Sequence, residues 1–356
     1  MTVHEKIAAD RTAPKLAAIP DDKDMLRAAV ELTRDIAEAR ADIYWPDMLG
    51  SAAVGYAALA GAIMAGNGLV AAACGIVSAI ALYRALLFIH ELTHIHRHAL
   101  PGFRFAWNLL VGIPLLTPSL MYEGVHTLHH ARTRYGTAED PEYLPLGLMK
   151  WWSLPVFIVS AVLLPVGLLI RCAVLNPLGA IIPPLRQLVW ERASALSINP
   201  AFRRRPAEGE FARMVFWQEL GVSVWAVFLL VSGYLYGWRP LLIGIAVVAL
   251  VAVLNQIRTL VAHLWINDGE AMTVTGQYLD SVNVPPPALL APIWAPVGLR
   301  YHALHHLLPS MPYHSLGEAH RRLLAELGGT STYGQANYTG LLPLVGRLAR
   351  STMKQR

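Results

Sequence analysis

The chain has 356 residues, of which 55% are apolar and 15% charged, and its formal net charge is +5. Soluble domains usually carry about 25% charged residues, so this composition excludes an ordinary water-soluble enzyme and indicates one membrane domain. The cations lie between apolar segments, as in residues 203–213, and are not interleaved with aromatic residues. This pattern favours a cytoplasmic loop of a membrane protein and argues against nucleic-acid binding. Cys74 and Cys172 have no CxxC partner, which argues against a disulfide framework or a cysteine metal site.

The chain begins with a polar N-terminal arm, residues 1–45. We expect an amphipathic helix in this arm over residues 25–41. Its apolar face would be formed by Leu26, Val30, Ile36 and Ala37.

Four apolar segments predict helices that cross the hydrocarbon core, which takes about 20 residues. They are residues 48–65, 69–89, 214–235 and 241–254, the last extending as a helix towards His263. The shorter stretch 107–120 contains Pro114 and Pro118, and we expect it to form a re-entrant or interfacial hairpin. Residues 152–184 are apolar but broken by proline, so a hairpin and a membrane-surface element both remain open. The fold class is therefore all-α integral membrane, with about four transmembrane helices plus interfacial helices.

Eight histidines form three motifs with helical spacing. His90 and His94, in the sequence HELTH, follow the second apolar segment directly. The motifs HTLHH and HALHH place three histidines each at i, i+3 and i+4, on one face of a helix. They comprise His126, His129, His130, His302, His305 and His306. A ninth histidine, His263, lies near the end of the last apolar segment.

This number of imidazoles predicts a centre with more than one metal ion. Neutral imidazole binds iron, copper, zinc and nickel, and eight or nine ligands exceed the four that a tetrahedral zinc uses. Two ions with four or five ligands each accommodate the number, and iron suits a site that activates O2. In contrast, we interpret His4 and His320 as ordinary surface or core residues.

The three motifs resemble those of the membrane fatty acid desaturase and hydroxylase superfamily, in particular its bacterial fatty acid desaturase branch. The segments EGVHTLHHARTRYGTAEDPEY and APVGLRYHALHHLLPSMPYH carry the resemblance, which extends over residues 45–323. It implies a cytosolic cap that carries the histidine motifs, two iron ions ligated by the motif histidines, and His263 as an additional ligand. The predicted organisation is a polar arm (1–45), a membrane desaturase-like domain (46–323) and a C-terminal tail (324–356).

Other residues are candidates to support the metal ligands. A ligating imidazole usually donates its second N–H to a carboxylate or carbonyl group. The carboxylates nearest the motifs in sequence are Glu91, Glu123, Asp140, Asp268 and Asp280. Some relatives have an asparagine four residues before the additional histidine, where this chain has Thr259, and Asn255 lies one turn further back. His314 is a further supporting candidate, and no direct ligation is expected of His96, His98 or His314.

A zinc protease and a metal transporter are the two alternatives to this prediction. HELTH also fits the HExxH motif of zinc proteases, here an intramembrane protease with Glu91 as base and Asp268, beside Gly269, as a distant ligand. That interpretation leaves both HxxHH motifs unexplained. A metal transporter would need ionisable residues near the bilayer midplane, and the apolar segments are almost free of them.

The predicted function is O2-dependent oxidation of a lipid by a di-iron oxidoreductase. On the resemblance we favour a desaturase of an acyl-lipid or acyl-thioester, with a lipid hydroxylase or carotenoid-type oxygenase as the alternative. The outcome depends on substrate position within about 1 Å, which leaves the reaction, chain length and head group open.

The electron donor is expected to be a separate protein of the ferredoxin, rubredoxin or cytochrome b5 type, since no HPGG haem motif occurs. Arg97, Arg132 and Arg134 could dock an acidic carrier or contact lipid head groups. We expect the protein in the bacterial inner membrane, with the histidine motifs facing the cytoplasm.

Overall fold

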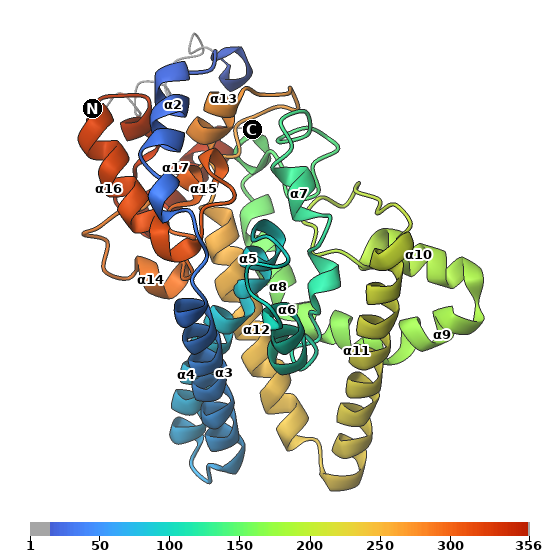
Figure 1. Cartoon of the computed structure of the whole chain (residues 1–356). Helices are drawn as coiled ribbons and strands as arrows, with labels where there is room; N and C mark the ends of the chain where they lie inside the picture. Colours follow the sequence, from blue (N-terminus) through green and yellow to red (C-terminus); the bar gives the residue numbers. More distant parts are fainter. Residues whose placement is uncertain (1–14, 355–356) are drawn as a thin grey trace. The chain divides into compact units, whose positions relative to one another are not determined.

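The computed structural model describes residues 15–354, so His4 lies outside the described residues. This part of the chain is helical and has no β-strand, only isolated bridges such as His263 to Ser281 (Figure 1). The chain divides into two compact units, each assembled from separate segments. Of the described residues, the membrane unit comprises 40–125 and 157–256, and the histidine-rich unit comprises 15–39, 126–156 and 257–354. The predicted all-α class is confirmed.

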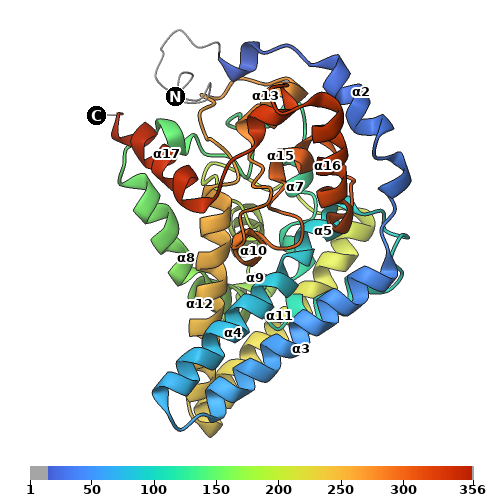
Figure 2. The same ribbon diagram turned by 90° about the vertical axis from the view of Figure 1, so that its left-hand side faces the viewer.

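The membrane unit begins with a helical hairpin of α3 (Ala41–Met64) and α4 (Gly68–Leu86), which lie side by side (Figure 2). The Asn67 side chain starts α4 by accepting hydrogen bonds from the backbone N–H groups of Leu69 (2.8 Å) and Val70 (3.3 Å). The hairpin is tightly packed at Gly55, where an added Cβ would lie 2.6 Å from the Leu82 side chain. A larger residue at position 55 would therefore force the two helices apart.

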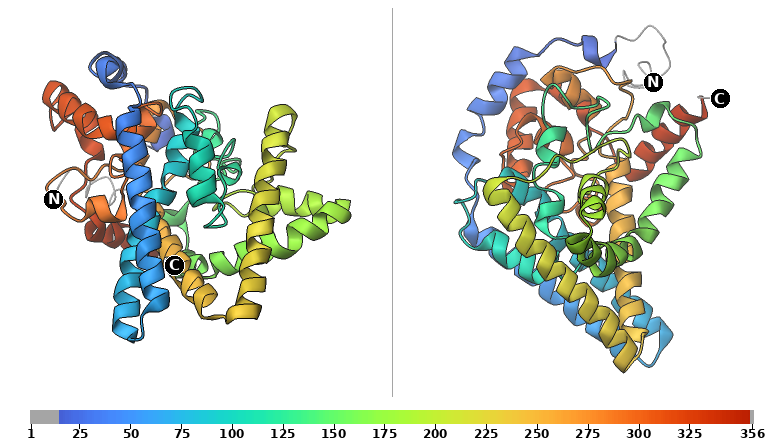
Figure 3. Two further views of the ribbon diagram at one scale, coloured as in Figure 1. Left: turned by 60° about the horizontal axis from the view of Figure 1, so that its bottom comes forward. Right: turned by 90° about the vertical axis from the view of Figure 1, so that its right-hand side faces the viewer.

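A second hairpin is formed by α11 (Gly209–Tyr236) and α12 (Arg239–Leu260), whose joined ends are visible in Figure 3. Gly237 makes the turn with φ +99°, a conformation that favours glycine. All four predicted spans are helical, and each helical run is longer than predicted because it continues into segments with polar residues, as at Asp42 and Arg258.

Within residues 15–354, five helical runs are long and apolar enough to cross a membrane. They are Ala41–Met64, Gly68–His94, Ser153–Ile181, Gly209–Tyr236 and Arg239–Leu260. Large apolar side chains are exposed along these runs, such as Leu163 (68% exposed) and Val224 (61% exposed). Exposure of this kind is stable only where lipid surrounds the helix. The chain is an integral membrane protein.

The segment 152–184, which the sequence left open, forms a 29-residue helical run. It consists of α8 (Ser153–Ile170), a π-helical turn (Arg171–Leu175) and α9 (Asn176–Ile181). The next helix, α10 (Pro183–Ala193), starts at two consecutive prolines. Arg171, the first residue of the π turn, is buried and pairs with Glu219 of α11 at 3.2 Å.

The stretch 107–120, expected to form a re-entrant or interfacial hairpin, is a short helix followed by a turn. It follows α6 (Phe103–Trp107) as a π-helical turn (Asn108–Gly112) and then loses regular structure. The Asn108 side chain accepts from the Ser119 backbone N–H at 2.8 Å and donates to the Ser119 hydroxyl at 3.0 Å. Gln218 accepts from the Leu120 N–H at 2.8 Å. Protein groups thus satisfy the irregular backbone, as a membrane environment requires.

In the histidine-rich unit, α2 (Lys23–Glu31) packs on α16 (Leu316–Leu327). The predicted N-terminal helix is shorter than expected, and its apolar face is only partly the predicted one, since Leu26 and Ile36 pack against this core. Met25 and Ala29, one turn apart, are buried against α16, whereas Val30 is 54% exposed. The unit also contains α13 (Val274–Asp280), α14 (Ala291–Trp294) and α17 (Leu341–Met353).

Candidate metal centre

The HELTH pair, His90 and His94, lies in the membrane unit on α5 (Phe88–His94), which continues α4 after Leu87. The two rings share one face, with centroids 4.9 Å apart. Glu91 accepts a hydrogen bond from the Tyr44 hydroxyl of α3, and its carboxylate lies 3.6 Å from His90 Nδ1. The Tyr44 ring also packs edge-on against Phe88. Aromatic packing and one buried carboxylate therefore hold α5 in place.

The HTLHH motif lies in the histidine-rich unit on α7 (His126–His129), with His130 directly after it. His129 Nδ1 is 2.9 Å from Asp140, and His126 Nδ1 is 2.8 Å from Glu142. Asp140 also accepts from the backbone N–H groups of Gly136 (2.9 Å) and Glu142 (2.8 Å). Since carboxylates accept, both Nδ1 atoms carry the proton and both Nε2 atoms keep a lone pair.

His263 follows α12 and is held by backbone pairing between residues 262–264 and 280–282. Its Nδ1 lies 2.8 Å from the Tyr135 hydroxyl and 3.1 Å from the Ser281 hydroxyl. Tyr135 donates its own proton to Asp280, and Ser281 donates to the Gln277 carbonyl. Both hydroxyls can therefore only accept from His263, which puts the imidazole proton on Nδ1 and the lone pair on Nε2.

The HALHH motif forms α15 (His302–Leu307), whose three histidines are all buried. The Asn283 side chain accepts from the Leu304 N–H at 3.0 Å, and the Val282 carbonyl accepts from the Ala303 N–H at 3.1 Å. The segment 282–283, which directly follows the partner of His263, therefore also fixes the start of α15.

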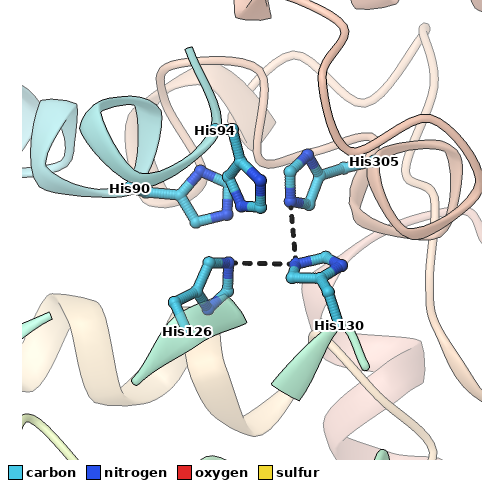
Figure 4. Close-up of side chains that lie close together, drawn as sticks. All are labelled: His90, His94, His126, His130 and His305. Carbon is cyan, nitrogen blue, oxygen red and sulfur yellow. Dashed lines mark hydrogen bonds between the residues drawn. The ribbon is translucent and has the colours of Figure 1, made fainter. Parts of the chain in front are cut away.

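Two clusters of imidazoles result in the histidine-rich unit. In the four-histidine cluster, one ring nitrogen of each member lies within 4.8 Å of the others. Its members are His129, His263, His302 and His306. In the three-histidine cluster, the Nε2 of His130 lies 3.0 Å from that of His126 and 3.1 Å from that of His305. Figure 4 shows these two contacts as dashed lines and also draws the HELTH pair of the membrane unit.

The separations between ring nitrogens fit ligands of a shared ion. Two nitrogens at about 2.1 Å from one ion are about 3.0 Å apart at a right angle and about 3.4 Å apart at the tetrahedral angle. In the four-histidine cluster, the Nε2 of His302 is 3.0 Å from that of His263 and 3.2 Å from that of His306. If these contacts were hydrogen bonds alone, the single N–H of His302 would have to be donated to both His263 and His306. The donor set therefore fits a metal ion that binds imidazole.

The protonation states favour metal binding as well. Burial lowers the pKa of His263 and of His306 well below the ordinary value, so both rings are neutral at pH 7. Burial also lowers the pKa of His129, but the adjacent Asp140 carboxylate outweighs it and the net pKa is raised. Asp140 thus stabilises positive charge at His129, whether a proton or a metal ion supplies it. Burial raises the pKa of Asp280 to about 6.

The other residues that were predicted to support the metal ligands differ in their contacts and burial. Glu123 pairs with Arg104 and accepts from Ser119 at 2.9 Å, and His314 contacts the Ser315 hydroxyl at 3.0 Å. Asn255 and Thr259 are half-buried on the last turns of α12. His96 and His98 are exposed, with rings 5.3 Å apart, and belong to neither cluster. His320 is buried and contacts the Tyr333 hydroxyl at 2.8 Å, as expected for an ordinary core residue.

Asp268 does not fit its predicted role. Its side chain is 50% exposed and pairs with Lys15 at 3.2 Å, so the carboxylate is directed to the N-terminal segment. The HExxH protease interpretation needs Asp268 as a ligand and Glu91 as a free base. With Asp268 paired at the surface and Glu91 bonded to Tyr44, the protease chemistry has no support here.

Three contacts of the clusters were missed from sequence. They involve Glu142, Tyr135 and Ser281. Glu142 stands two residues after Asp140 in the segment Asp-Pro-Glu, so the paired acids could have indicated two neighbouring histidine contacts. Tyr135 and Ser281 carry no such signal, because their contacts depend on how the loops fold.

Comparisons with known proteins cover the segments that form this site. Residues 66–335 match the family described as fatty acid desaturase, a range that includes all three histidine motifs. A ceramide hydroxylase of Caulobacter vibrioides (strain NA1000 / CB15N) is 46% identical over 338 residues, 94% of this chain and 96% of that protein. No solved structure matches significantly.

Proposed function

Because the chain belongs to the fatty acid desaturase family, we propose that it is an iron-dependent lipid hydroxylase that acts on a ceramide-like substrate. The observation that carries the proposal is the 46% identity with a ceramide hydroxylase over nearly the whole length of both chains. Desaturation, which we favoured on the motifs alone, is less well supported because that relative is a hydroxylase. That the chain is a lipid oxidoreductase follows from either comparison.

The proposed centre holds two iron ions. One is assigned to the four-histidine cluster (His129, His263, His302 and His306). The other is assigned to the three-histidine cluster (His126, His130 and His305). The HELTH pair (His90 and His94) is proposed, on its motif, as a further pair of iron ligands. Bound iron would supply the activation of O2 for attack on a C–H bond that is otherwise inert.

The chain's own residues would fix the geometry of this centre. Asp140, Glu142 and Tyr135 each hold an Nδ1–H, which leaves the corresponding Nε2 lone pairs directed to the metal. Burial of the imidazoles excludes bulk water, and it keeps His263 and His306 neutral by lowering their pKa. The balanced reaction consumes one O2, two electrons and two protons. One oxygen atom replaces a C–H bond by C–OH and the other leaves as water.

The two electrons would come from a separate carrier of the ferredoxin, rubredoxin or cytochrome b5 type. Arg132 is the candidate docking residue with the most exposed side chain (63%), although it also pairs with Asp21 at 3.0 Å. We further propose that the histidine motifs face the cytoplasm of a bacterial inner membrane, on the side of the basic loop at residues 203–213.

The test is lipid mass spectrometry after expression in a host that makes ceramides. The proposal expects ceramides that have gained one oxygen atom. The variant His129→Ala should be inactive, and the variant His98→Ala, at an exposed position, should be active. Ceramides or acyl chains that have lost two hydrogens would assign desaturation. No change in any lipid, with iron bound and a donor supplied, would reject both reactions.

A further inference from the structure

The membrane unit contains a cavity of about 660 Å³ that is lined by this unit alone. Its walls come from α3, α4, α8, α11 and α12, together with the irregular turn that contains Pro114 and Leu116. None of the lining residues is charged, and nearly all are apolar. Pockets that hold small molecules have volumes of about 300–1,000 Å³, so this cavity has the size of a ligand site.

The cavity is elongated along the helices. On α11 the lining extends from Trp225 to Tyr236, which corresponds to about 16 Å at the helical rise of about 1.5 Å per residue. One end lies at the α11–α12 turn, where Gly237 and Pro240 contribute to the wall. The other end includes Leu82, eight residues before His90 on one helical run, or about 12 Å. The long axis therefore leads towards the end of the helix that carries the HELTH pair.

Two polar side chains of the lining, Tyr56 and Trp225, are engaged elsewhere. The Tyr56 hydroxyl donates to the Leu110 carbonyl at 2.7 Å, and Trp225 Nε1 donates to the Pro114 carbonyl at 3.1 Å. A buried water needs two to four polar partners, and these two side chains present only apolar surface to the cavity. An empty space would leave the lining atoms without contacts. The geometry fits an uncharged, extended hydrocarbon chain.

We propose that this cavity binds the distal part of the substrate's alkyl chain, beyond the carbon that reacts, and so selects substrates by chain length. The inference rests on the proposed lipid hydroxylase function, and it names the part of the protein that recognises the chain. A chain that is too long for the space between Leu82 and the α11–α12 turn would hold its reacting carbon out of position.

Gly244 of α12 provides a sharp test, because it lines the cavity and an added Cβ would meet no atom within 4 Å. The variant Gly244→Phe should shorten the space without displacing a helix. Gly167→Phe is the matched control, because Gly167 of α8 also has no neighbour within 4 Å but is exposed and outside the lining. Ceramides with long and short N-acyl chains serve as substrates.

We expect Gly244→Phe to lower the ratio of long-chain to short-chain conversion by at least about tenfold, the effect of misfitting even one methylene in an apolar pocket. The smaller Gly244→Leu should give an intermediate ratio, and Gly167→Phe should keep the wild-type ratio. An unchanged ratio in Gly244→Phe, or an equal loss at all chain lengths in both Gly244 variants, would overturn the proposal.

A binding measurement separates this inference from the proposed reaction. A ceramide with a photoreactive diazirine near the methyl end of its acyl chain should label residues 225–248 in the wild type and in Gly167→Phe, but not in Gly244→Phe. Labelling in this pattern without any hydroxylated product would keep the cavity assignment and reject the hydroxylase. Hydroxylated product with no labelling of these residues would reject the cavity assignment alone.

Discussion

Each imidazole with a resolved Nδ1 contact is oriented by a specific neighbour, and these neighbours differ in chemistry. His129 and His126 are held by carboxylates, whereas His263 is held by two hydroxyl groups. A carboxylate makes the imidazole a stronger donor to a metal than a hydroxyl does. Asp140 has the additional task of organising its own loop through two backbone N–H groups, so its loss should have the largest effect.

We therefore predict that Asp140→Asn lowers metal affinity or activity about 10–100-fold, because an amide no longer fixes the Nδ1–H tautomer of His129 or balances its charge. Iron content and hydroxylase activity would be measured together. Glu139→Gln is the matched control, because Glu139 is next in sequence, 70% exposed, and pairs only with Arg134 among the contacts seen. Wild-type iron content and activity in Asp140→Asn would contradict the assignment.

A second residue-scale prediction concerns His320 of α16. Burial lowers the pKa of His320 to about 4, whereas the unfolded chain would bind the proton at its ordinary value of 6.5. The unfolded state therefore takes up more protons between these values, and stability must fall as pH falls from about 6.5 to 4. At pH 5 the loss from this group is on the order of 2 kcal/mol.

The variant His320→Gln removes this titration. Its free energy of unfolding in detergent should change less between pH 7 and pH 5 than that of the wild type, whatever its absolute stability. Equal pH dependence in the two proteins would show that His320 is protonated in the folded state at pH 5.

At the scale of elements, the helical run Ser153–Ile181 raises a question of connectivity. His129 and His263 lie in one cluster, so the chain between them must cross the membrane an even number of times. The helices α11 and α12 account for two crossings. The run α8–α9 must therefore return to its starting side through α10. The π turn after α8 and the proline pair at the start of α10 are consistent with this change of direction.

Cysteine labelling from either side of the membrane tests this return. The variants Ala201→Cys, in the loop after α10, and Glu139→Cys should react with a membrane-impermeant thiol reagent from the same side. Gly66→Cys, in the α3–α4 turn, should react only from the opposite side. Cys74 and Cys172 would first be replaced by alanine. Reaction of Ala201→Cys together with Gly66→Cys would show that the run crosses completely.

The elements also show what sequence could predict. Hydropathy identified the four long spans, since nearly every residue of a helix that crosses the hydrocarbon core must be apolar. The i, i+3, i+4 spacing of the HxxHH histidines predicted that each set shares one face of a helix. Hydropathy could not resolve residues 152–184, because proline and a π turn change the direction of an apolar helix without changing its composition. The partners of the imidazoles were only partly predictable, as Asp268 pairs with Lys15, 253 residues away.

At the scale of the whole molecule, three segments of the chain, around His129, His263 and His302, meet within the histidine clusters. Metal binding should therefore stabilise the fold. A ligand that binds only the folded state at about 100 times its Kd adds about 2.7 kcal/mol. Removal of iron with a strong chelator should lower the unfolding temperature in detergent, and added Fe2+ should restore it.

The double variant His302→Ala/His130→Ala provides the control for chelation. It lacks the central imidazole of each cluster. Its unfolding temperature should be lower than that of the iron-bound wild type and should not respond to the chelator. A wild-type protein that unfolds at the same temperature with and without chelator would contradict coupling between metal and fold.

The most direct test of the central claim is the metal content of the purified protein, measured by mass spectrometry of bound metals per chain. Two irons in the wild type, about one in His302→Ala and about one in His130→Ala would agree with one iron in each cluster. A single zinc per chain with no iron would contradict the two-cluster iron centre. So would a result in which one of the two variants keeps both irons.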